Sequence, residues 1–473
     1  MSSDNLSYDV RLYKIEPRKG KRRTTYRLRW AVAGKPFQET HATSKLAASA
    51  LADLQRAASR GEAFDTTTGL PRSMATSRID RRWVEVAREF VDAKWERSAP
   101  NHRKSTAEGL VTLTSALVRE GRTPPNAKQL RLALMHWEFN TTARTNATEP
   151  PEEHREAVRW IADNSRQISH LGSTEGVRQA LDALDRNLDG SRAAKSTVAR
   201  KRAALSGVIN FAIEKGYLEA NLMNQIRTTR RTTSVAVDPG VVVNPDQARA
   251  LLDAVMRIDP TLHAFFASIY YAAPRPGETR NIREDNLTLP DEGWGEIRLR
   301  KNFQQPGAGW TDDGEVGEER GLKHRDEDDV RPVPAHPDLV QAYRRHIEEH
   351  GTGVGGRLFV TRVGRGGNGG VPIAGPFQNP VNMKTVYRVW EAARAEALTP
   401  RQYASDLARR PYDLRHACVS TWLSAGVAPA QVAKWAGHSI DVLMKTYAKC
   451  LDDQENAAKK RIEALLNGTR DQG

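Results

Sequence analysis

The sequence has only two cysteines, Cys418 and Cys450, among 473 residues. Two thiols cannot build a disulfide framework, and this low cysteine usage is typical of a reducing compartment. No apolar run approaches the ~18 residues that a membrane-spanning helix needs. The first residues, Met1–Asn5, have neither the basic nor the apolar region of a secretory signal. We therefore expect a cytoplasmic protein without a membrane partner.

A metal or nucleotide site is also missing from the sequence. No His, Cys, Asp and Glu residues cluster at the spacing of metal ligands. The glycine-rich stretch 364–370 is not followed by the Gly-Lys-Ser/Thr motif of a phosphate-binding loop, so a flexible loop is the better interpretation. We expect the protein to work with no cofactor and no metal.

Basic residues are in excess over acidic residues. Lys and Arg number 72 against 58 Asp and Glu, which gives a net charge of +14 and a pI near 9.8. A basic surplus on a long chain favours a polyanionic partner, most often nucleic acid. A merely soluble basic protein is the alternative, and charge alone separates the two only weakly. The length predicts about two to four domains.

Residues 1–62 are predicted to form a small α+β domain. Apolar residues alternate over 8–12 and over 26–32, as they do in half-buried strands, and Phe37 follows a turn. Ser44 is a plausible N-cap of a helix that ends at Gly61. The expected result is a three-stranded sheet backed by one helix.

This small domain carries a basic loop and a basic strand face. If the apolar residues of strand 26–32 face the core, Arg27 and Arg29, which alternate with them, face outward. A solvated strand face or a nuclear-import-like run would also explain these charges. We favour DNA contact, because so small a sheet does not need such a loop to fold. The candidate DNA-binding residues are Arg18, Lys19, Lys21, Arg22, Arg23, Arg27 and Arg29.

Residues 78–235 are predicted to form an all-α domain, after a segment of linker composition at 62–77. Apolar residues recur at helical spacing from Trp83 to Trp95 and over 103–118, and a further helix is expected at 153–165. The basic segment 195–202 opens another helix, where unpaired N–H groups and the helix dipole attract anions. A solvated helix face is the alternative to DNA contact. The candidates are Lys195, Thr197, Arg200 and Lys201.

Residues 241–473 follow a second linker and are predicted to form a mixed, mainly α domain with a small β-sheet. Asn244-Pro245 is a good helix start, and helical patterns cover 248–256 and 262–272. Strands are expected at 295–300 and 330–334, on either side of a charged loop.

Two arginines, a histidine and a tyrosine stand out in this last domain. Arg275 opens an Arg-x-x-Glu spacing that ends at Glu278, Arg415 lies in Asp-Leu-Arg-His, and Tyr447 follows Gly-His by nine residues. Guanidinium forks pair with the oxygens of a phosphodiester in bidentate fashion. A tyrosine oxygen can form a covalent ester with the phosphorus, which splits one difficult transfer into two easier steps.

From about 244 to 452 the order of these motifs resembles the catalytic domain of the tyrosine recombinases, the phage integrase family. Each motif alone is weak, but together and in this order they are specific. Residues 80–235 resemble the helical core-binding domain of that family, and residues 1–62 resemble the arm-binding domain of integrases that bind two classes of DNA site.

The resemblance implies a set of roles. Tyr447 would attack the scissile phosphorus, and Arg275 and Arg415 would clamp the non-bridging oxygens. Lys323, which precedes the Val-Pro strand, would protonate the leaving 5′-oxygen, with Lys301 as the other lysine of the hairpin. The candidate catalytic residues are Arg275, Lys323, Tyr412, Arg415, His438 and Tyr447. Glu278 would orient Arg275, and His416 is open to either a packing or a catalytic role.

One position departs from the family pattern. Tyr412 stands where the second box usually begins with histidine. A phenol with a pKa near ~10 can donate a hydrogen bond but is a poor proton shuttle at neutral pH. General-base assistance by this residue is therefore open, whereas stabilisation of the phosphate charge is unaffected.

The implied partners are double-stranded DNA attachment sites, further copies of the chain in a tetramer on DNA, and a small excision factor. The C-terminal helix predicted around 457–466 would dock on a neighbouring copy. A type IB topoisomerase and a non-catalytic DNA-binding relative are the alternatives. The basic N-terminal domain favours an integrase over the first, and the filled catalytic positions argue against the second.

Overall fold

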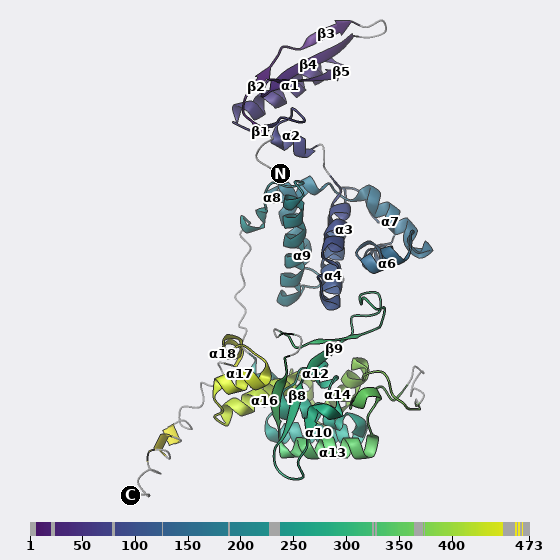
Figure 1. Ribbon diagram of the computed structural model, residues 1–473, viewed down its shortest axis with the longest axis vertical. Helices are drawn as coiled ribbons and strands as arrows, with labels where there is room; N and C mark the ends of the chain where they lie inside the picture. Colours follow the sequence, from purple (N-terminus) through teal and green to yellow (C-terminus); the bar gives the residue numbers. More distant parts are fainter. Residues whose placement is uncertain are drawn as a thin grey trace. The chain divides into compact units, whose positions relative to one another are not determined.

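The computed structural model divides the chain into two compact units (Figure 1), one made of Met1–Thr229 with Pro306–Val316 and one of Arg230–Gln305 with Gly317–Gly473. It describes residues 6–19, 24–77, 81–124, 126–187, 190–226, 237–323, 326, 329–363, 372, 374–447, 459–460, 462–463 and 466. The glycine-rich stretch 364–370, most of the second linker and much of the predicted C-terminal helix lie outside these residues.

The first unit begins with a sheet of four strands, one more than predicted. Its strands are β2 (Val10–Leu12), β3 (Glu16–Lys19), β4 (Thr24–Val32) and β5 (Lys35–His41). The central strand β4 is long enough to pair with β2 at one end and β3 at the other, so the chain before it forms two short strands instead of one. Helix α1 (Ser44–Ser59) packs on this sheet (Figure 1), and Leu28 and Trp30 are buried in the core between them.

Two local predictions for this region are wrong. The N-cap of α1 is Thr43, whose hydroxyl accepts the Leu46 N–H, and not Ser44. The segment 62–77 is packed, since it forms β6 (Phe64–Asp65), paired with β1 (Leu6–Ser7), and helix α2 (Arg72–Ser77). Its polar residues are used locally, because the Asp65 carboxylate accepts the N–H groups of the turn that follows it.

A bundle of helices forms the rest of the first unit. The helices are α3 (Trp83–Lys94), α4 (Pro100–Ala116), α5 (Ala127–Ala133) with a π-helical turn Leu134–Glu138, α6 (Thr141–Asn146), α7 (Glu152–Asn164), α8 (Thr174–Leu184) and α9 (Lys195–Glu214), with short 3-10 helices at Ile168–Gly172 and Leu222–Asn224. The predicted helices at 83–95, 103–118 and 153–165 are confirmed within a few residues. Trp83, Leu110 and Leu205 are fully buried in its core.

Residues 306–316 belong to this first unit although they lie within the predicted catalytic region of the sequence. Trp310 is 4% exposed in the helical core, with its ring centroid 5.9 Å from that of Trp95. The buried Arg103 side chain donates to the Trp310 carbonyl at 2.9 Å and pairs with Asp312 at 2.6 Å. Asn140 Nδ2 also donates to the Gly309 carbonyl, at 2.8 Å. The segment is therefore part of the helical core.

The second unit is mixed and mainly helical. Its helices are α10 (Pro245–Ile258), α11 (His263–Ala272), α12 (Pro276–Thr279), α13 (Pro337–His350), α14 (Met383–Ala397), α15 (Pro400–Ala404), α16 (Asp413–Ser424), α17 (Pro429–Ala436) and α18 (Ile440–Tyr447), with short 3-10 helices at Pro239–Val241, Pro260–Leu262, Glu284–Asn286 and Val354–Gly356. Asn244 caps α10 as predicted, in a capping box with Gln247. None of the helices in the described part of the chain has the length and apolar character that crossing a bilayer requires.

Two small sheets accompany these helices. Strands β7 (Leu287–Thr288), β8 (Gly295–Leu299) and β11 (Arg331–Ala335) form an antiparallel sheet in the order β11-β8-β7. Strands β9 (Lys301–Gln304) and β10 (Glu318–Gly321) pair as an antiparallel hairpin, and residues 306–316 form the excursion between them. The predicted strands at 295–300 and 330–334 are confirmed.

Replacing Trp310 by alanine tests whether the excursion stabilises the first unit. We expect Trp310→Ala to lower the free energy of unfolding of that unit by about 3–5 kcal/mol, because it leaves a cavity in the helical core. Urea unfolding followed by tryptophan fluorescence and circular dichroism measures the change. Trp294→Ala is the matched control, since Trp294 is 59% exposed. Equal effects of the two substitutions would contradict a structural role for the excursion.

Candidate active site

Arg275 and Glu278 are placed by one short helix. The chain leaves α11 through Ala273, which has a left-handed backbone with φ 51°, and Arg275 then becomes the N-cap of α12. The Glu278 carboxylate reaches back to the Arg275 N–H at 2.7 Å, as the third residue of a capping box does. The Arg-x-x-Glu spacing in the sequence is therefore the spacing of a helix cap.

Glu278 binds the side chains of two arginines. Its carboxylate pairs with Arg275 at 2.9 Å and with Arg331 of β11 at 2.6 and 3.2 Å. Glu278 and Arg331 are each 1% exposed, whereas the side chain of Arg275 is 22% exposed. Two guanidinium groups thus share one buried carboxylate, and Arg275 is the one that solvent reaches.

The sequence reasoning missed Arg331. A signal was present, because Arg331, Val333 and Ala335 alternate along β11 and all three are buried. A charged residue at an inward position of a strand needs a buried partner of opposite charge. The sequence does not show which carboxylate that is, since Glu278 lies 53 residues earlier.

The charge of Glu278 follows from its neighbours. Burial by itself raises the pKa of this carboxyl group, but the attraction of Arg331 and Arg275 and the hydrogen bond from Arg331 outweigh burial and lower the pKa to about 2. The group is therefore ionised at neutral pH and holds both arginines in fixed orientations.

Arg415 on α16 is fully buried and is bound only by neutral groups in the described part of the chain. Its guanidinium donates to the carbonyl of Ala273, to the carbonyl of Ala436 at 2.5 Å and to His438 Nε2 at 2.8 Å. Arg275 donates in the same region, to the Gly437 carbonyl at 2.7 Å. The turn after α17 thus gathers both predicted arginines.

His438 follows that turn and is neutral. Burial lowers its pKa to about 3, and repulsion from Arg415 and Arg275 adds to the effect. A guanidinium can only donate, so His438 accepts through Nε2 and its proton lies on Nδ1. Gly437 before it has φ +64°, and an added Cβ would collide with the Arg331 guanidinium. Glycine is therefore the residue that this position favours.

Tyr447, at the end of α18, is 1% exposed and contacts His416. Its phenol oxygen lies 2.8 Å from His416 Nδ1, and its ring is stacked on that of His438 with centroids 6.3 Å apart. Tyr412, one helical turn before His416, lies edge-on to the His416 ring at 5.1 Å. The structure therefore brings Arg275, Tyr412, Arg415, His438 and Tyr447 together.

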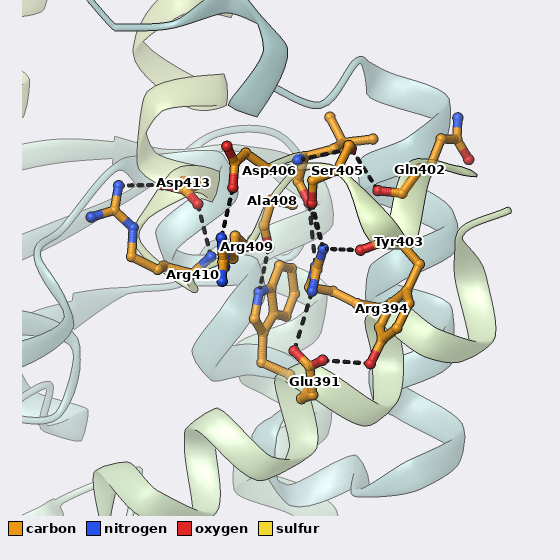
Figure 2. Close-up of polar contacts among 12 residues, drawn as sticks. Glu391, Arg394, Gln402, Tyr403, Ser405, Asp406, Ala408, Arg409, Arg410 and Asp413 are labelled. Carbon is orange, nitrogen blue, oxygen red and sulfur yellow. Dashed lines mark hydrogen bonds and ion pairs between the residues drawn. The ribbon is translucent and has the colours of Figure 1, made fainter. Parts of the chain in front are cut away.

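The start of α16 is fixed by the chain before it. Figure 2 shows Arg394 of α14 pointing into the turn at 403–408, where it donates to the carbonyls of Tyr403 and Leu407 at 3.0 and 3.1 Å. At the helix start, the Asp413 carboxylate accepts the Arg410 N–H at 2.8 Å and its side chain at 3.0 Å (Figure 2). These contacts orient the first turn of α16, which carries Arg415 and His416.

Lys323 is not part of this group of residues. It is exposed and lies two residues after the end of β10. Its hairpin is nevertheless anchored, since Glu319 of β10 pairs with Arg283 and Arg357 at 2.6 Å each and Leu322 is buried. Lys301 on β9 is exposed as well.

The predicted DNA-binding residues lie in the first unit. Arg27 and Arg29 both pair with Glu16, so the strand face is partly neutralised, while Arg18 and Lys19 are exposed on β3. Lys21, Arg22 and Arg23 lie outside the described residues. On α9, Lys195 and Arg200 are exposed and Thr197 is half-buried. Burial lowers the pKa of Lys201 on the same helix.

No group of three or more His, Cys, Asp or Glu side chains within the described ranges is arranged to hold a metal ion. The side chains that the site brings together are arginines, histidines and tyrosines. Together they can bind an anion, transfer a proton and offer a phenol oxygen as nucleophile.

A comparison of the sequence with protein-family models finds no match, and a comparison with curated proteins finds none. Among solved structures, the chain is similar to the Tn1549 transposon integrase in complex with a circular intermediate DNA, with 14% identity and a TM-score of 0.45 over 71% of this chain and 98% of that chain. It is also similar to the XerH site-specific recombinase bound to its difH substrate, with 12% identity and a TM-score of 0.40 over 76% and 95%. For a lambda integrase dimer bound to a core site, the identity is 13% and the TM-score 0.39 over 71% and 91%.

The charge of Glu278 predicts a dependence of stability on pH. Because its pKa is lowered to about 2 in the folded protein, its contribution is complete above the unfolded value of ~4.3 and is lost as the pH falls through about 2. We expect Glu278→Gln to destabilise the second unit by about 3–5 kcal/mol near neutral pH. Urea unfolding of both proteins should show this difference shrinking over that acidic range. Glu296→Gln, at an exposed ion pair with Arg298, is the control. A difference that does not change with pH would contradict the assignment.

Proposed function

We propose that the protein is a site-specific DNA recombinase that cleaves and rejoins DNA strands through a 3′-phosphotyrosine intermediate. One observation carries this proposal. The guanidinium of Arg415 is fully buried, and its hydrogen bonds within the described residues all go to neutral acceptors. A buried charge that is hydrogen-bonded only to neutral groups is costly. The site is therefore built to receive an anion.

The balance of charge favours a phosphodiester as that anion. Arg275, Arg331 and Arg415 surround one carboxylate, that of Glu278, and His438 adds no charge because its pKa is lowered to about 3. The surplus positive charge matches the single negative charge of a phosphodiester better than it matches a neutral substrate. Guanidinium forks held in advance can also stabilise the added charge of a pentacoordinate transition state, and loss of such a group typically costs about 3 kcal/mol or more.

The remaining side chains supply the chemistry of strand transfer. Tyr447 is the nucleophile, and its oxygen forms the ester with the 3′-phosphate while the 5′-oxygen leaves. Arg275 and Arg415 bind the non-bridging oxygens. Lys323, on the anchored hairpin, protonates the leaving oxygen, and His438 and Tyr412 donate hydrogen bonds to the phosphate. Because the ester conserves the energy of the broken bond, rejoining needs no nucleotide.

The first unit supplies DNA recognition in this proposal. Exposed basic residues at its two predicted contact surfaces, such as Arg18 and Arg200, suit contacts to phosphate groups. Residues 1–62 bind arm-type sites, and residues 78–235 grip the core site. Four copies assemble on attachment sites of a phage or another mobile element, and a small excision factor sets the direction. The ion pairs of Glu16 make Arg27 and Arg29 the weaker candidates for DNA contact.

Substitution of the nucleophile tests the proposal directly. Tyr447→Phe should abolish the covalent protein–DNA adduct on a nicked attachment-site duplex, because phenylalanine has no oxygen to form the ester. DNA affinity should change little. Denaturing gel electrophoresis with labelled DNA detects the adduct, and a gel-shift titration measures the affinity. Adduct formation by Tyr447→Phe that is lost only with Tyr412→Phe would assign the other tyrosine. Relaxation of supercoiled DNA without strand exchange would instead indicate a topoisomerase.

The role of Lys323 can be separated from that of Lys301 by changing the leaving group. Lys323→Ala should slow cleavage by about 10²–10⁴-fold, because the 5′-oxygen then leaves without a proton. A DNA with sulfur in the 5′-bridging position needs no such proton, so its cleavage should be nearly as fast as with the unchanged protein. Lys301→Ala is the matched control on the same hairpin. The same pattern in Lys301→Ala alone would transfer the role to Lys301.

A further inference from the structure

His416 is a histidine to which the strand-transfer chemistry above assigns no task. It lies on α16 directly after Arg415, and its Nδ1 is 2.8 Å from the phenol oxygen of Tyr447. Helix α16 is held at its start by the contacts between Asp413 and Arg410, and α17 and α18 pack against each other beside it (Figure 1). The contact thus joins the proposed nucleophile to a side chain on a firmly held helix.

We propose that His416 is the general base that takes the proton from Tyr447. This inference rests on the proposed function, since it concerns the first step of that reaction. A candidate base has to lie within hydrogen-bond reach of the proton that it abstracts, and His416 does. Tyr412, in contrast, is itself a phenol and contacts His416 through an edge-to-face ring pair. The proposed base, His416, thus lies one helical turn after Tyr412, which stands where the family pattern usually has a histidine.

The step is balanced in atoms and charge. The O–H bond of Tyr447 breaks as its oxygen bonds to phosphorus, and the proton moves to Nδ1 of His416, which becomes an imidazolium. The bond from phosphorus to the 5′-oxygen breaks, and that oxygen receives a proton from Lys323. On rejoining, the 5′-hydroxyl attacks the phosphotyrosine and His416 returns the proton to the departing phenol oxygen.

The surroundings keep His416 neutral until DNA binds. Burial lowers its pKa to about 4, Asp413 opposes this effect, and Arg415 and Arg410 reinforce it. Tyr412, Tyr447 and His438 are the other titratable groups that face it. A neutral imidazole can accept a proton, which an imidazolium cannot. A phosphodiester bound at the arginines offsets their positive charge, so its arrival raises the basicity of His416 at the moment when a base is needed.

The experiment compares His416→Asn with the unchanged full-length protein in single-turnover adduct formation. The DNA carries sulfur in the 5′-bridging position, so that leaving-group protonation does not limit the rate. We expect His416→Asn to lower the rate of adduct formation by about 10²–10⁴-fold near neutral pH. Its rate should then rise with pH as the phenol, with a reference pKa of ~10, ionises without help. His263→Asn, a second half-buried histidine of the same unit whose pKa desolvation also lowers, should react at the unchanged rate.

A second variant separates proton transfer from packing. Tyr447→fluorotyrosine lowers the pKa of the nucleophile, so combining it with His416→Asn should restore most of the lost rate. A rate loss that is the same at every pH and is not rescued by the fluorinated phenol would reduce His416 to a packing residue and overturn the proposal. If Tyr412→Phe, and not His416→Asn, loses rate near neutral pH and recovers it as the pH rises, the general base is Tyr412.

Failure of the two proposals can be told apart. If His416→Asn forms the adduct at the unchanged rate, only the role of His416 is wrong. If the unchanged protein forms no adduct on any attachment-site or nicked duplex, the proposed function is wrong, and this inference with it.

Discussion

The buried carboxylate of Glu278 is the interaction on which the candidate site depends. It caps α12, fixes the fork of Arg275 and neutralises Arg331 in the interior. Without it, three guanidinium groups would lie close together with no negative charge among them, which is a costly arrangement in a protein interior. One side chain thus supports a helix start, a strand and the solvent-accessible Arg275 together.

Backbone groups hold Arg415, and they hold Arg275 in addition to its carboxylate partner. Arg415 is held by carbonyls from the end of α11 and the end of α17, and Arg275 by the carbonyl that follows α17. Helix ends leave carbonyls without intrahelical partners, so they are natural acceptors for guanidinium groups. The helices of the second unit therefore set the positions of the charges. In the proposed function, donors fixed in this way would need no rearrangement when charge develops on a bound phosphate.

Residues 306–316 lie between two strands of the second unit but belong to the first unit. The hairpin strands β9 and β10 belong to the unit with the arginines, whereas the residues between them are buried among helices α3 and α4 of the other unit. The candidate lysine follows this hairpin after Leu322.

Much of the local structure could be predicted from the sequence. Strand alternation predicted β4, helical spacing predicted α3, α4 and α9, and Asn244-Pro245 predicted the start of α10. These features depend on residues a few positions apart, so short windows contain the information. The same holds for the helix cap that joins Arg275 to Glu278. Where the sequence reasoning failed, as at 62–77, turn-forming residues were taken for a linker although Phe64 and Leu70 fill a core.

The amino-acid order by itself determined which chemical groups this protein has and how they are spaced along the chain: arginines, a histidine and a tyrosine in motifs that predict phosphodiester chemistry. Only the tertiary structure decided which of them meet. Arg331 joins Glu278 across 53 positions, His416 meets Tyr447 across 31, and Trp310 reaches a helix some 200 residues earlier. Such pairs are brought together by the packing of whole helices and strands, and a long-range contact leaves no periodic trace in a single sequence.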